Sequence, residues 1–477
     1  MEKLKLFLHQ NKTSIICTII PMVIFAIFFL GYYPGIIPYD GANQWNQVKS
    51  GLITNSHPFF STYFILLLSK IHHTTTPIIL FQMFMFSIIW GYFCGLVSKN
   101  SKHNVIIYIF TTVMCLLPII SIFAISLWKD ILYSYYLFMI SVLLYKGVIN
   151  KFKYHTRDYI LFGVLLTLIC NYRHNGLYVV IMYLILLSII LFIKRKIITK
   201  KVLKNIGITI LTFVILMVAI SIPKHIYLNK SSKVIAKKEA KKGKKEIISL
   251  QNNYILWMMG EHIKDGNIKN TKDIKFLNNI LEIKEWKKTY DPYIINSITQ
   301  SEDINGKFVN QHKSKLMNIF IKYSTKYPLT IVKHYIKSDA LIINPVPDKE
   351  AYVYVFAFSE WGFLGFDRIT TPRIPYVREL YDKVINLSFK GALKWFYQPA
   401  LIFYLSIIML IVLSIKVYGR KIYLIATPVF LNSISLLPIN LAQDLRYVYI
   451  NYLVFFAILL LFILNFNKIF IKQKKKV

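Results

Sequence analysis

The sequence is poor in charge, and above all in acidic residues. Only 17% of its 477 residues are charged, whereas 55% are hydrophobic and 16% are aromatic. Soluble enzymes and disordered chains carry far more charge, so the composition excludes both classes and indicates a multi-pass membrane protein. Asp and Glu number 22 against 58 Lys and Arg, a formal net charge of +36. Such an excess also suggests a nucleic-acid binder, but the apolar content favours basic loops beside membrane spans.

Cysteine is scarce and has no spacing typical of metal ligands. Cys17, Cys94, Cys115 and Cys170 each lie inside an apolar run, so the sequence predicts neither a disulfide framework nor a metal site. The basic start, 1–5, is similar to the beginning of a signal sequence. The apolar stretch that follows it lacks an Ala-x-Ala cleavage site, so we expect an uncleaved first span.

Apolar runs long enough to cross a bilayer recur along the chain. They predict an all-α polytopic membrane protein with about ten transmembrane helices, at 14–35, 77–98, 104–127, 131–149, 157–172, 176–193, 205–223, 398–416, 421–439 and 447–468. A further run, 59–71, is too short to span and predicts an interfacial or re-entrant helix. With the N-terminus inside, the basic clusters between closely spaced spans all fall on the cytoplasmic side. We therefore expect a plasma-membrane protein with both termini in the cytoplasm.

A long hydrophilic stretch, 224–397, separates the seventh and eighth predicted spans and lies outside in this topology. It holds 30 of the 58 basic residues and 17 of the 22 acidic residues, and long loops translocate largely regardless of charge. We expect it to be one mostly helical extracytoplasmic domain. It would separate an N-terminal membrane module, 1–223, which contains a first external loop at 36–76, from the C-terminal membrane helices, 398–477.

Few acidic residues remain outside that stretch, and their positions are informative. Asp40, Asp130 and Asp444 all fall at predicted external ends of spans. Acidic residues beside membrane segments are costly, and they are functional more often than average. Three carboxylates on one membrane face are what a catalytic cleft at that face would need.

The first external loop carries the first of these carboxylates. Asp40 could act as a general base or orient an attacking hydroxyl, and Asn43 and Gln44 follow it closely. His57, further along the loop, could pair with Asp40 or contact a phosphate. The alternative is a polar turn in which Asp40 caps a helix over 41–49.

The second carboxylate lies in the segment Trp128-Lys129-Asp130, at the entry to a predicted span. Lys129 supplies a positive charge for a phosphate, and Trp128 offers a ring on which a sugar could stack. The alternative is an aromatic-belt tryptophan beside an interfacial ion pair, which is common at membrane edges.

Two further polar segments lie at predicted external ends. Arg173, His174 and Asn175 form a tight connection between two spans, where an arginine needs an anionic partner and suits a phosphate. The alternative there is a snorkelling arginine beside a turn. Asp444 and Arg446, at the entry to the last span, could bind each other or reach the same external cleft. The sequence leaves that choice open.

Together these segments resemble GT-C-type glycosyltransferases, which are multi-pass enzymes that use polyprenyl-phosphate-linked sugars as donors. The resemblance covers predicted spans one to six and the last span, and rests on Tyr39-Asp40-Gly41, His57-Pro58, Trp128-Lys129-Asp130, Arg173-His174-Asn175-Gly176 and Asp444-Leu445-Arg446-Tyr447. Asp40 matches the position of the family's first-loop catalytic acid. Where the family has paired acids, this sequence has Asp40-Gly41. This departure from the family favours Asp40 acting alone. We therefore expect no cofactor, and a divalent metal remains an alternative that the sequence does not indicate.

The resemblance implies an inverting transfer of one sugar to an envelope polymer, glycolipid or protein on the outer face of the membrane. Asp40 would be the base for the acceptor hydroxyl. The residues that would bind the donor phosphate are Arg173, Lys129, His57, His174 and Arg446. Those that would position the substrates are Asn43, Gln44, Trp128, Asp130, Asn175 and Asp444.

Two other functions remain open at this stage. A polymerase or ligase of lipid-linked glycan repeat units would share most of this chemistry. A flippase or transporter for lipid-linked sugars should instead place charges along a path at the bilayer midplane. Here the charges gather at one predicted edge of the membrane, which favours the transferase.

Overall fold

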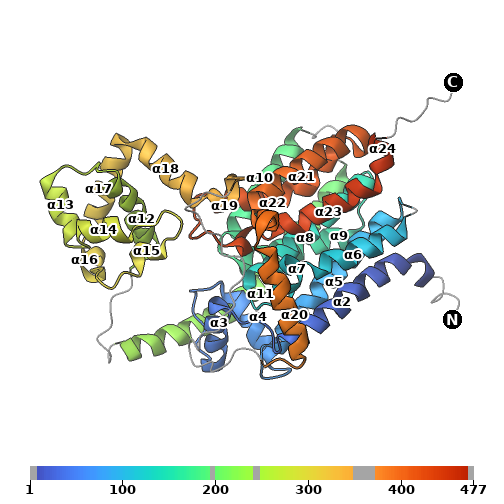
Figure 1. The fold of residues 1–477 in the computed structure, drawn as a ribbon, viewed down its shortest axis with the longest axis horizontal. Helices are drawn as coiled ribbons and strands as arrows, with labels where there is room; N and C mark the ends of the chain where they lie inside the picture. Colours follow the sequence, from blue (N-terminus) through green and yellow to red (C-terminus); the bar gives the residue numbers. More distant parts are fainter. Residues whose placement is uncertain (1–7, 102, 194–198, 240–247, 347–370, 471–477) are drawn as a thin grey trace. The chain divides into compact units, whose positions relative to one another are not determined.

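The computed structural model describes residues 8–101, 103–193, 199–239, 248–346 and 371–470. Every element in these ranges is helical, and extended pairing is limited to isolated bridges between Ile36 and Ser126 and between Ile294 and Ala442 (Figure 1). The expectation of an all-α chain is confirmed. The chain forms two compact units, which we call the membrane unit (1–233, 355–435 and 446–477) and the helical unit (234–354 and 436–445).

Six described helices of the membrane unit are long and apolar enough to cross a membrane. They are α2 (Lys12–Gly31), α5 (Thr76–Ser98), α8 (Lys129–Ile149), α10 (Gly176–Ile193), α11 (Lys200–Glu239) and α21 (Pro399–Leu413) with its π-helical extension η2 (Ser414–Tyr418). A seventh would be α6 (Asn104–Leu116) and α7 (Pro118–Ala124) together, joined at a 70° bend. The bend arises because Leu117 precedes a proline, which favours the extended backbone that Leu117 adopts.

The other predicted spans correspond to shorter helices. The run 157–172 forms α9 (Thr156–Tyr172), and 421–439 forms η3 (Arg420–Ala426) followed by α22 (Thr427–Leu436). The last run, 447–468, forms η4 (Leu445–Val448), α23 (Ile450–Leu464) and α24 (Phe466–Phe470). The segment 36–76, which the sequence predicts to be the first external loop, contains two helices, α3 (Tyr39–Ser50) and α4 (Phe59–Ser69). Of these, α4 is the short apolar helix expected at 59–71.

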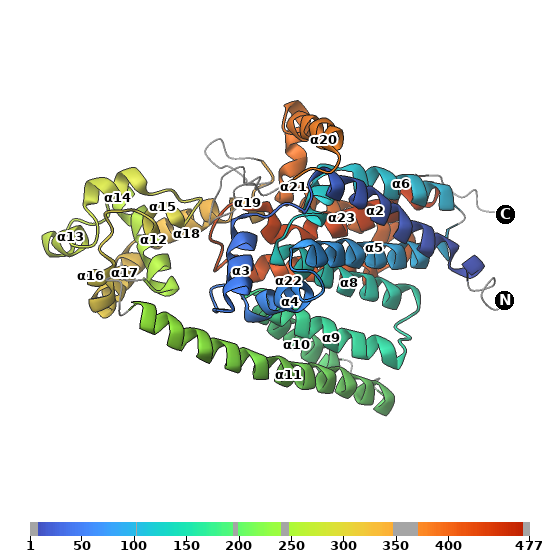
Figure 2. The same ribbon diagram turned by 90° about the horizontal axis from the view of Figure 1, so that it is seen from below.

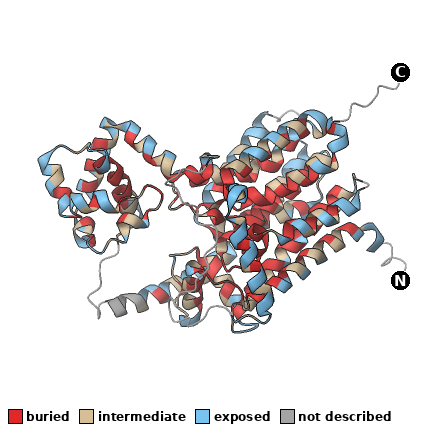
Figure 3. Ribbon diagram, in the orientation of Figure 1, coloured by how far each residue is buried: buried red, intermediate tan, exposed pale blue. Residues whose placement is uncertain are grey.

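Exposed apolar faces support the membrane assignment. Ile185 and Phe192 on α10, and Leu211 and Ile215 on α11, are each more than half exposed (Figure 3). Continuous apolar faces of this length suit lipid rather than water. The protein is therefore a helical membrane protein.

Successive long helices of the membrane unit run in opposite directions, so its connections gather at two ends (Figures 1 and 2). At one end, Lys146 pairs with Asp158 at 2.7 Å, and Lys421 lies over the ring of Phe152. We call this the basic end, because its connections carry Lys99, Lys151, Lys153, Arg157, Lys416, Arg420 and Lys421. At the other end, the site end, the start of α8 lies beside α3, the α9–α10 connection and η4.

The helical unit is built from short helices around a core that contains Trp257 and Trp286. Its elements are α12 (Leu250–Lys264), α13 (Thr271–Asn278), α14 (Ile283–Thr289), α15 (Asn296–Thr299), α16 (Gly306–Gln311), α17 (Lys313–Lys326), α18 (Pro328–Ser338) and α19 (Ala340–Ile343). The segment 436–445 returns to complete it, since the Gln443 amide oxygen accepts a hydrogen bond from the Leu341 N–H at 2.7 Å.

These units differ from the single soluble domain that we predict over 224–397. The helix α11 continues through 224 to Glu239, and the described residues 371–397 belong to the membrane unit. There α20 (Pro375–Ser388) and η1 (Gly391–Tyr397) precede α21. The helix α20 belongs to the membrane unit because of an apolar contact, in which Tyr381 of α20 is buried against Phe28 of α2.

The buried Asp339 should make the stability of the helical unit depend on pH. Burial raises the pKa of Asp339 to about 8, and a hydrogen bond with Asn440 offsets this only in part. The folded state therefore holds a proton that the unfolded state releases above about pH 4, so the free energy of unfolding should fall as pH rises towards 8. The full effect would be on the order of 5 kcal/mol.

The variant Asp339→Asn should remove this pH dependence, because an amide does not titrate. We expect it to unfold at a higher temperature than wild type at pH 8 and at a similar temperature at pH 4, measured by thermal unfolding of the full chain in detergent. Parallel pH profiles for the two proteins would contradict the prediction.

Candidate functional site

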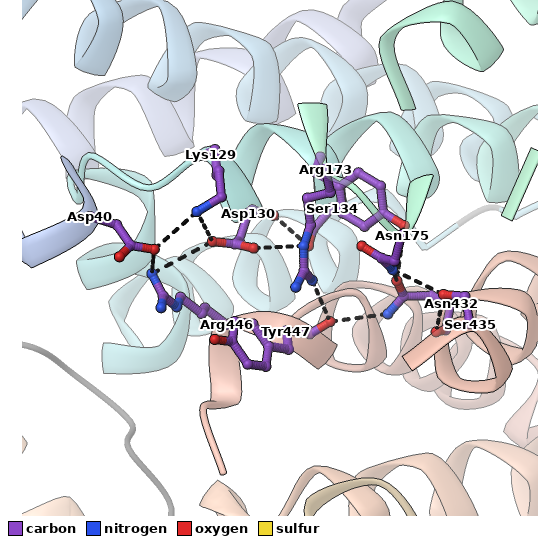
Figure 4. Close-up of polar contacts among 11 residues, drawn as sticks. Asp40, Lys129, Asp130, Ser134, Arg173, Asn175, Asn432, Ser435, Arg446 and Tyr447 are labelled. Carbon is purple, nitrogen blue, oxygen red and sulfur yellow. Dashed lines mark hydrogen bonds and ion pairs between the residues drawn. The ribbon is translucent and has the colours of Figure 1, made fainter. Parts of the chain in front are cut away.

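Five charged side chains from four parts of the chain meet at the site end (Figure 4). Asp40 lies in the first turn of α3, and Lys129 and Asp130 are the first two residues of α8. Arg173 directly follows α9, and Arg446 belongs to η4. We call these five residues the charged cluster, and all five are residues that the sequence predicts for the site.

Asp40 lies between two cations. Its Oδ2 accepts from Lys129 Nζ at 2.9 Å and from Arg446 Nη1 at 2.8 Å. Its side chain is 22% exposed, which makes it the most accessible member of these two pairs. The alternative role as a helix cap is wrong, because α3 begins one residue earlier, at Tyr39, and its N-cap residue is Pro38. Asp40 thus turns towards the cations.

Asp130 forms the buried centre of the cluster. Its side chain is fully buried, and its Oδ1 pairs with Arg173 Nε at 2.9 Å. Its Oδ2 lies 3.7 Å from Arg446 Nη1 and 3.9 Å from Lys129 Nζ. One buried carboxylate therefore faces all three cations, and its place in the first turn of α8 adds the favourable field of the helix N-terminus.

The cluster carries an excess of positive charge. Two carboxylates and three cations sum to +1 over these described side chains. His57 lies in the same field, and burial and the Lys129 ammonium lower the pKa of His57 to about 4, so it adds no charge at neutral pH. A partly buried site whose side chains sum to a net positive charge attracts an anion.

The same cations weaken Asp40 as a base. Burial raises the pKa of Asp40, but the Lys129 ammonium and the Arg446 guanidinium outweigh burial and hold the pKa well below its usual range. A carboxylate with so low a pKa accepts a proton poorly while both ion pairs last. Its basicity would recover if another anion took over the two cations.

Arg173 is held rigidly by its surroundings. Its guanidinium lies 4.7 Å from the ring centroid of Tyr447 and 5.5 Å from that of Tyr133, and its Nη1 donates to the Tyr447 carbonyl at 3.3 Å. The tight α9–α10 connection requires glycine at 176, because a Cβ there would lie 1.9 Å from the Ile169 carbonyl oxygen. These contacts place Arg173 between Asp130 and the two rings.

Two residues that the sequence predicts to position a substrate, Trp128 and Asn175, are buried in contacts with other side chains of the protein. Trp128 is buried, and the Arg446 guanidinium lies 5.0 Å from its ring centroid, so this ring does not offer an open surface for a sugar. Asn175 is also buried, and its amide donates to Asn432 at 3.2 Å and to Ser435 at 2.9 Å. Trp128 thus packs against a cation of the cluster, and Asn175 holds the α9–α10 connection against α22.

The remaining predicted residues lie around the cluster or away from it. Gln44 is buried and ties α3 to α4, since its amide donates to Ser61 and Thr62. Asn43 accepts from Gln47 at 2.8 Å, and His174 is exposed beside Arg173. Asp444 belongs to the helical unit, whereas the five residues of the charged cluster belong to the membrane unit.

Asn432 is not predicted from the sequence, and Tyr447 is named there only as part of a motif, without a role in the site. The Tyr447 carbonyl accepts from Asn432 at 3.0 Å as well as from Arg173, so these residues join the last two membrane segments to the cluster. Asn432 had a detectable signal, because it is a polar residue within the apolar run 421–439 and such residues need partners in a membrane.

The structure thus defines a helical membrane protein with a charged cluster at one end of its membrane unit. Comparison of the chain with protein-family models, with curated proteins and with solved structures finds no match. Among the residues that the structure describes, no group of three His, Cys, Asp or Glu side chains is arranged to hold a metal ion.

Proposed function

We propose that the protein is a membrane glycosyltransferase that moves a sugar from a polyprenyl-phosphate donor to a cell-envelope acceptor. The observation that carries this proposal is the partly buried cluster in which Asp40 shares two cations and the summed charge is +1. Transfer from a lipid phosphate needs cations for the charge that develops on the leaving phosphate, and a base for the acceptor hydroxyl. The cluster holds both kinds of group within ion-pair distance.

In this proposal the donor phosphate competes with Asp40 for its cations. Phosphate oxygens would accept hydrogen bonds from Lys129 and Arg446 in place of Asp40 Oδ2, and Asp130 would keep Arg173 as a fixed positive charge beside them. The released Asp40 carboxylate would regain its basicity and accept the proton of the acceptor hydroxyl. The acceptor oxygen then bonds to the anomeric carbon as the bond from that carbon to the phosphate oxygen breaks, which inverts the configuration there.

The distribution of basic residues supports an outer-face site. The basic end carries the lysines and arginines of the short connections, and such residues favour the cytoplasmic side. The site end, at the opposite ends of the same helices, would then face outward in the plasma membrane. The donor lipid and the envelope acceptor would both be accessible there.

The proposal is tested by comparing lipid-linked sugars and envelope glycans by mass spectrometry in cells with and without the protein. We expect cells that lack it to accumulate one polyprenyl-phosphate monosaccharide and to lose one decoration, and wild-type protein to restore both. Accumulation of larger lipid-linked glycans would favour a polymerase or ligase instead. Unchanged envelope glycans and unchanged lipid-linked sugars would contradict the proposal and would favour a transport function instead.

A further inference from the structure

Helix α20 lies against the last turns of α2, at the site end of the membrane unit. The ring of Tyr381 packs against that of Phe28 in a tilted arrangement with a centroid distance of 4.0 Å, and the Tyr381 hydroxyl donates to the Leu116 carbonyl at 3.1 Å. The Tyr32 hydroxyl donates to Asp382. These contacts fix one face of α20 to the bundle.

A second face of α20 is apolar and uncovered. Tyr376 is 72% exposed, Leu380 51%, Val384 38% and Leu387 59%. At about 100° per residue these four side chains fall within an arc of roughly 80°, adjacent to the buried arc that contains Tyr381. We call these four residues the α20 stripe. A water-soluble surface rarely holds four large apolar side chains in one line.

The segment after α20 continues the same surface. Phe389, Leu393 and Trp395 are between 37% and 60% exposed, and the span α21 begins only a few residues later, at Pro399. Exposed lysines accompany them at Lys383, Lys390 and Lys394. Tryptophan, leucine and lysine together are typical of segments that lie at the boundary between lipid chains and head groups.

We propose that α20 and η1 form an interfacial lipid-binding segment. The α20 stripe inserts between lipid chains, and Lys383, Lys390 and Lys394 bind the phosphates of anionic lipid head groups. Two observations favour a lipid surface over a protein partner: the segment leads directly into a span, and the described residues 371–398 carry five basic and two acidic side chains, which matches an anionic surface. This inference is independent of the proposed enzymatic function.

The orientation of α20 is tested with nitroxide labels on the full chain in nanodiscs of phosphatidylcholine and phosphatidylglycerol. Labels replace Leu380 and Leu387 in the stripe, and Glu379 and Asn386 on the exposed polar face serve as matched controls. Cys170→Ala removes the one native cysteine that is not buried.

We expect the stripe labels to be relaxed by oxygen and shielded from a water-soluble nickel chelate, and the control labels to show the reverse. Access of the nickel chelate to the stripe would overturn the proposal, because the stripe would then face water. Shielding from both reagents would overturn it too, because protein would then cover the stripe.

The role of the lysines is tested by lipid retention. The triple variant Lys383→Gln, Lys390→Gln and Lys394→Gln should retain at least about threefold less phosphatidylglycerol than wild type after detergent extraction, measured by mass spectrometry. A control that removes the same charge from exposed positions of the helical unit, Lys272→Gln, Lys287→Gln and Lys288→Gln, should retain the wild-type amount. Equal retention by the two triple variants would overturn the assignment of these lysines.

Discussion

Replacing Asp40 by Asn is expected to lower the rate of sugar transfer by about 10²–10⁴-fold, the range that loss of a general base produces. The amide has nearly the shape of the carboxylate, and its oxygen can still accept from Lys129 and Arg446, so folding and membrane insertion should be preserved. The measurement is transfer by the purified variant, or removal of the accumulated lipid-linked sugar when the variant is expressed in cells that lack the protein. A variant with near-normal turnover would show that Asp40 is not the base.

The matched control for this experiment is Asp158→Asn. Asp158 also pairs with a lysine, Lys146, at 2.7 Å, and it also belongs to the membrane unit, but it lies at the basic end. Removing its charge breaks an equivalent ion pair away from the proposed chemistry. We expect this variant to lose some thermal stability and to keep its transfer rate, which separates loss of catalysis from loss of an ion pair.

Replacing Asp130 by Asn is expected to destabilise the folded protein by about 3–5 kcal/mol, the usual cost of removing one partner from a buried ion pair. The fully buried carboxylate faces Arg173, Arg446 and Lys129, and without it the cluster would hold three cations against Asp40 alone. Thermal unfolding in detergent measures the effect. An unfolding temperature equal to that of wild type would contradict the role of Asp130 as the centre of the cluster.

A double variant shows whether the cause is unbalanced charge. Adding Arg173→Gln to Asp130→Asn removes the cation that lies closest to Asp130, at 2.9 Å, and returns the cluster to its wild-type charge of +1. We expect the double variant to be more stable than Asp130→Asn alone, because replacing both partners of a buried pair costs less than removing one. If the destabilisation by Arg173→Gln simply added to that by Asp130→Asn, lost packing rather than unbalanced charge would explain the destabilisation by Asp130→Asn.

The residues of the cluster could be predicted from the sequence because charges are rare in this chain. A carboxylate or guanidinium at the edge of an apolar run is too costly to leave unpaired, so Asp40, Asp130, Arg173 and Arg446 stood out against their surroundings. Because successive membrane helices run in opposite directions, the span ends that carry these four residues are expected to lie at the same face of the membrane. The long apolar runs also predict the helical membrane fold, because a helix satisfies all the backbone hydrogen bonds of such a run within a membrane.

The partners within the cluster could not be predicted, because they depend on packing between distant segments. The sequence does not show that Trp128 lies under Arg446, or that Asn175 bonds to Asn432 across 257 positions. The sequence also places the amphipathic helix α20 in the hydrophilic domain that it predicts over 224–397. Its charged residues made it hydrophilic on average, although its buried face contacts α2. Average hydropathy does not distinguish such a helix from a soluble one.

The contact between Asp40 and Arg446 joins residues 406 positions apart, and this has a consequence for biosynthesis. A ribosome completes the first-loop and α8 segments long before it reaches Arg446, and segments begin to fold in the order of their synthesis. Until then, Asp40, Lys129, Asp130 and Arg173 sum to zero charge. The excess positive charge that would attract a lipid phosphate arises only when the final segment has been inserted, so a chain cut short before that point would be inert.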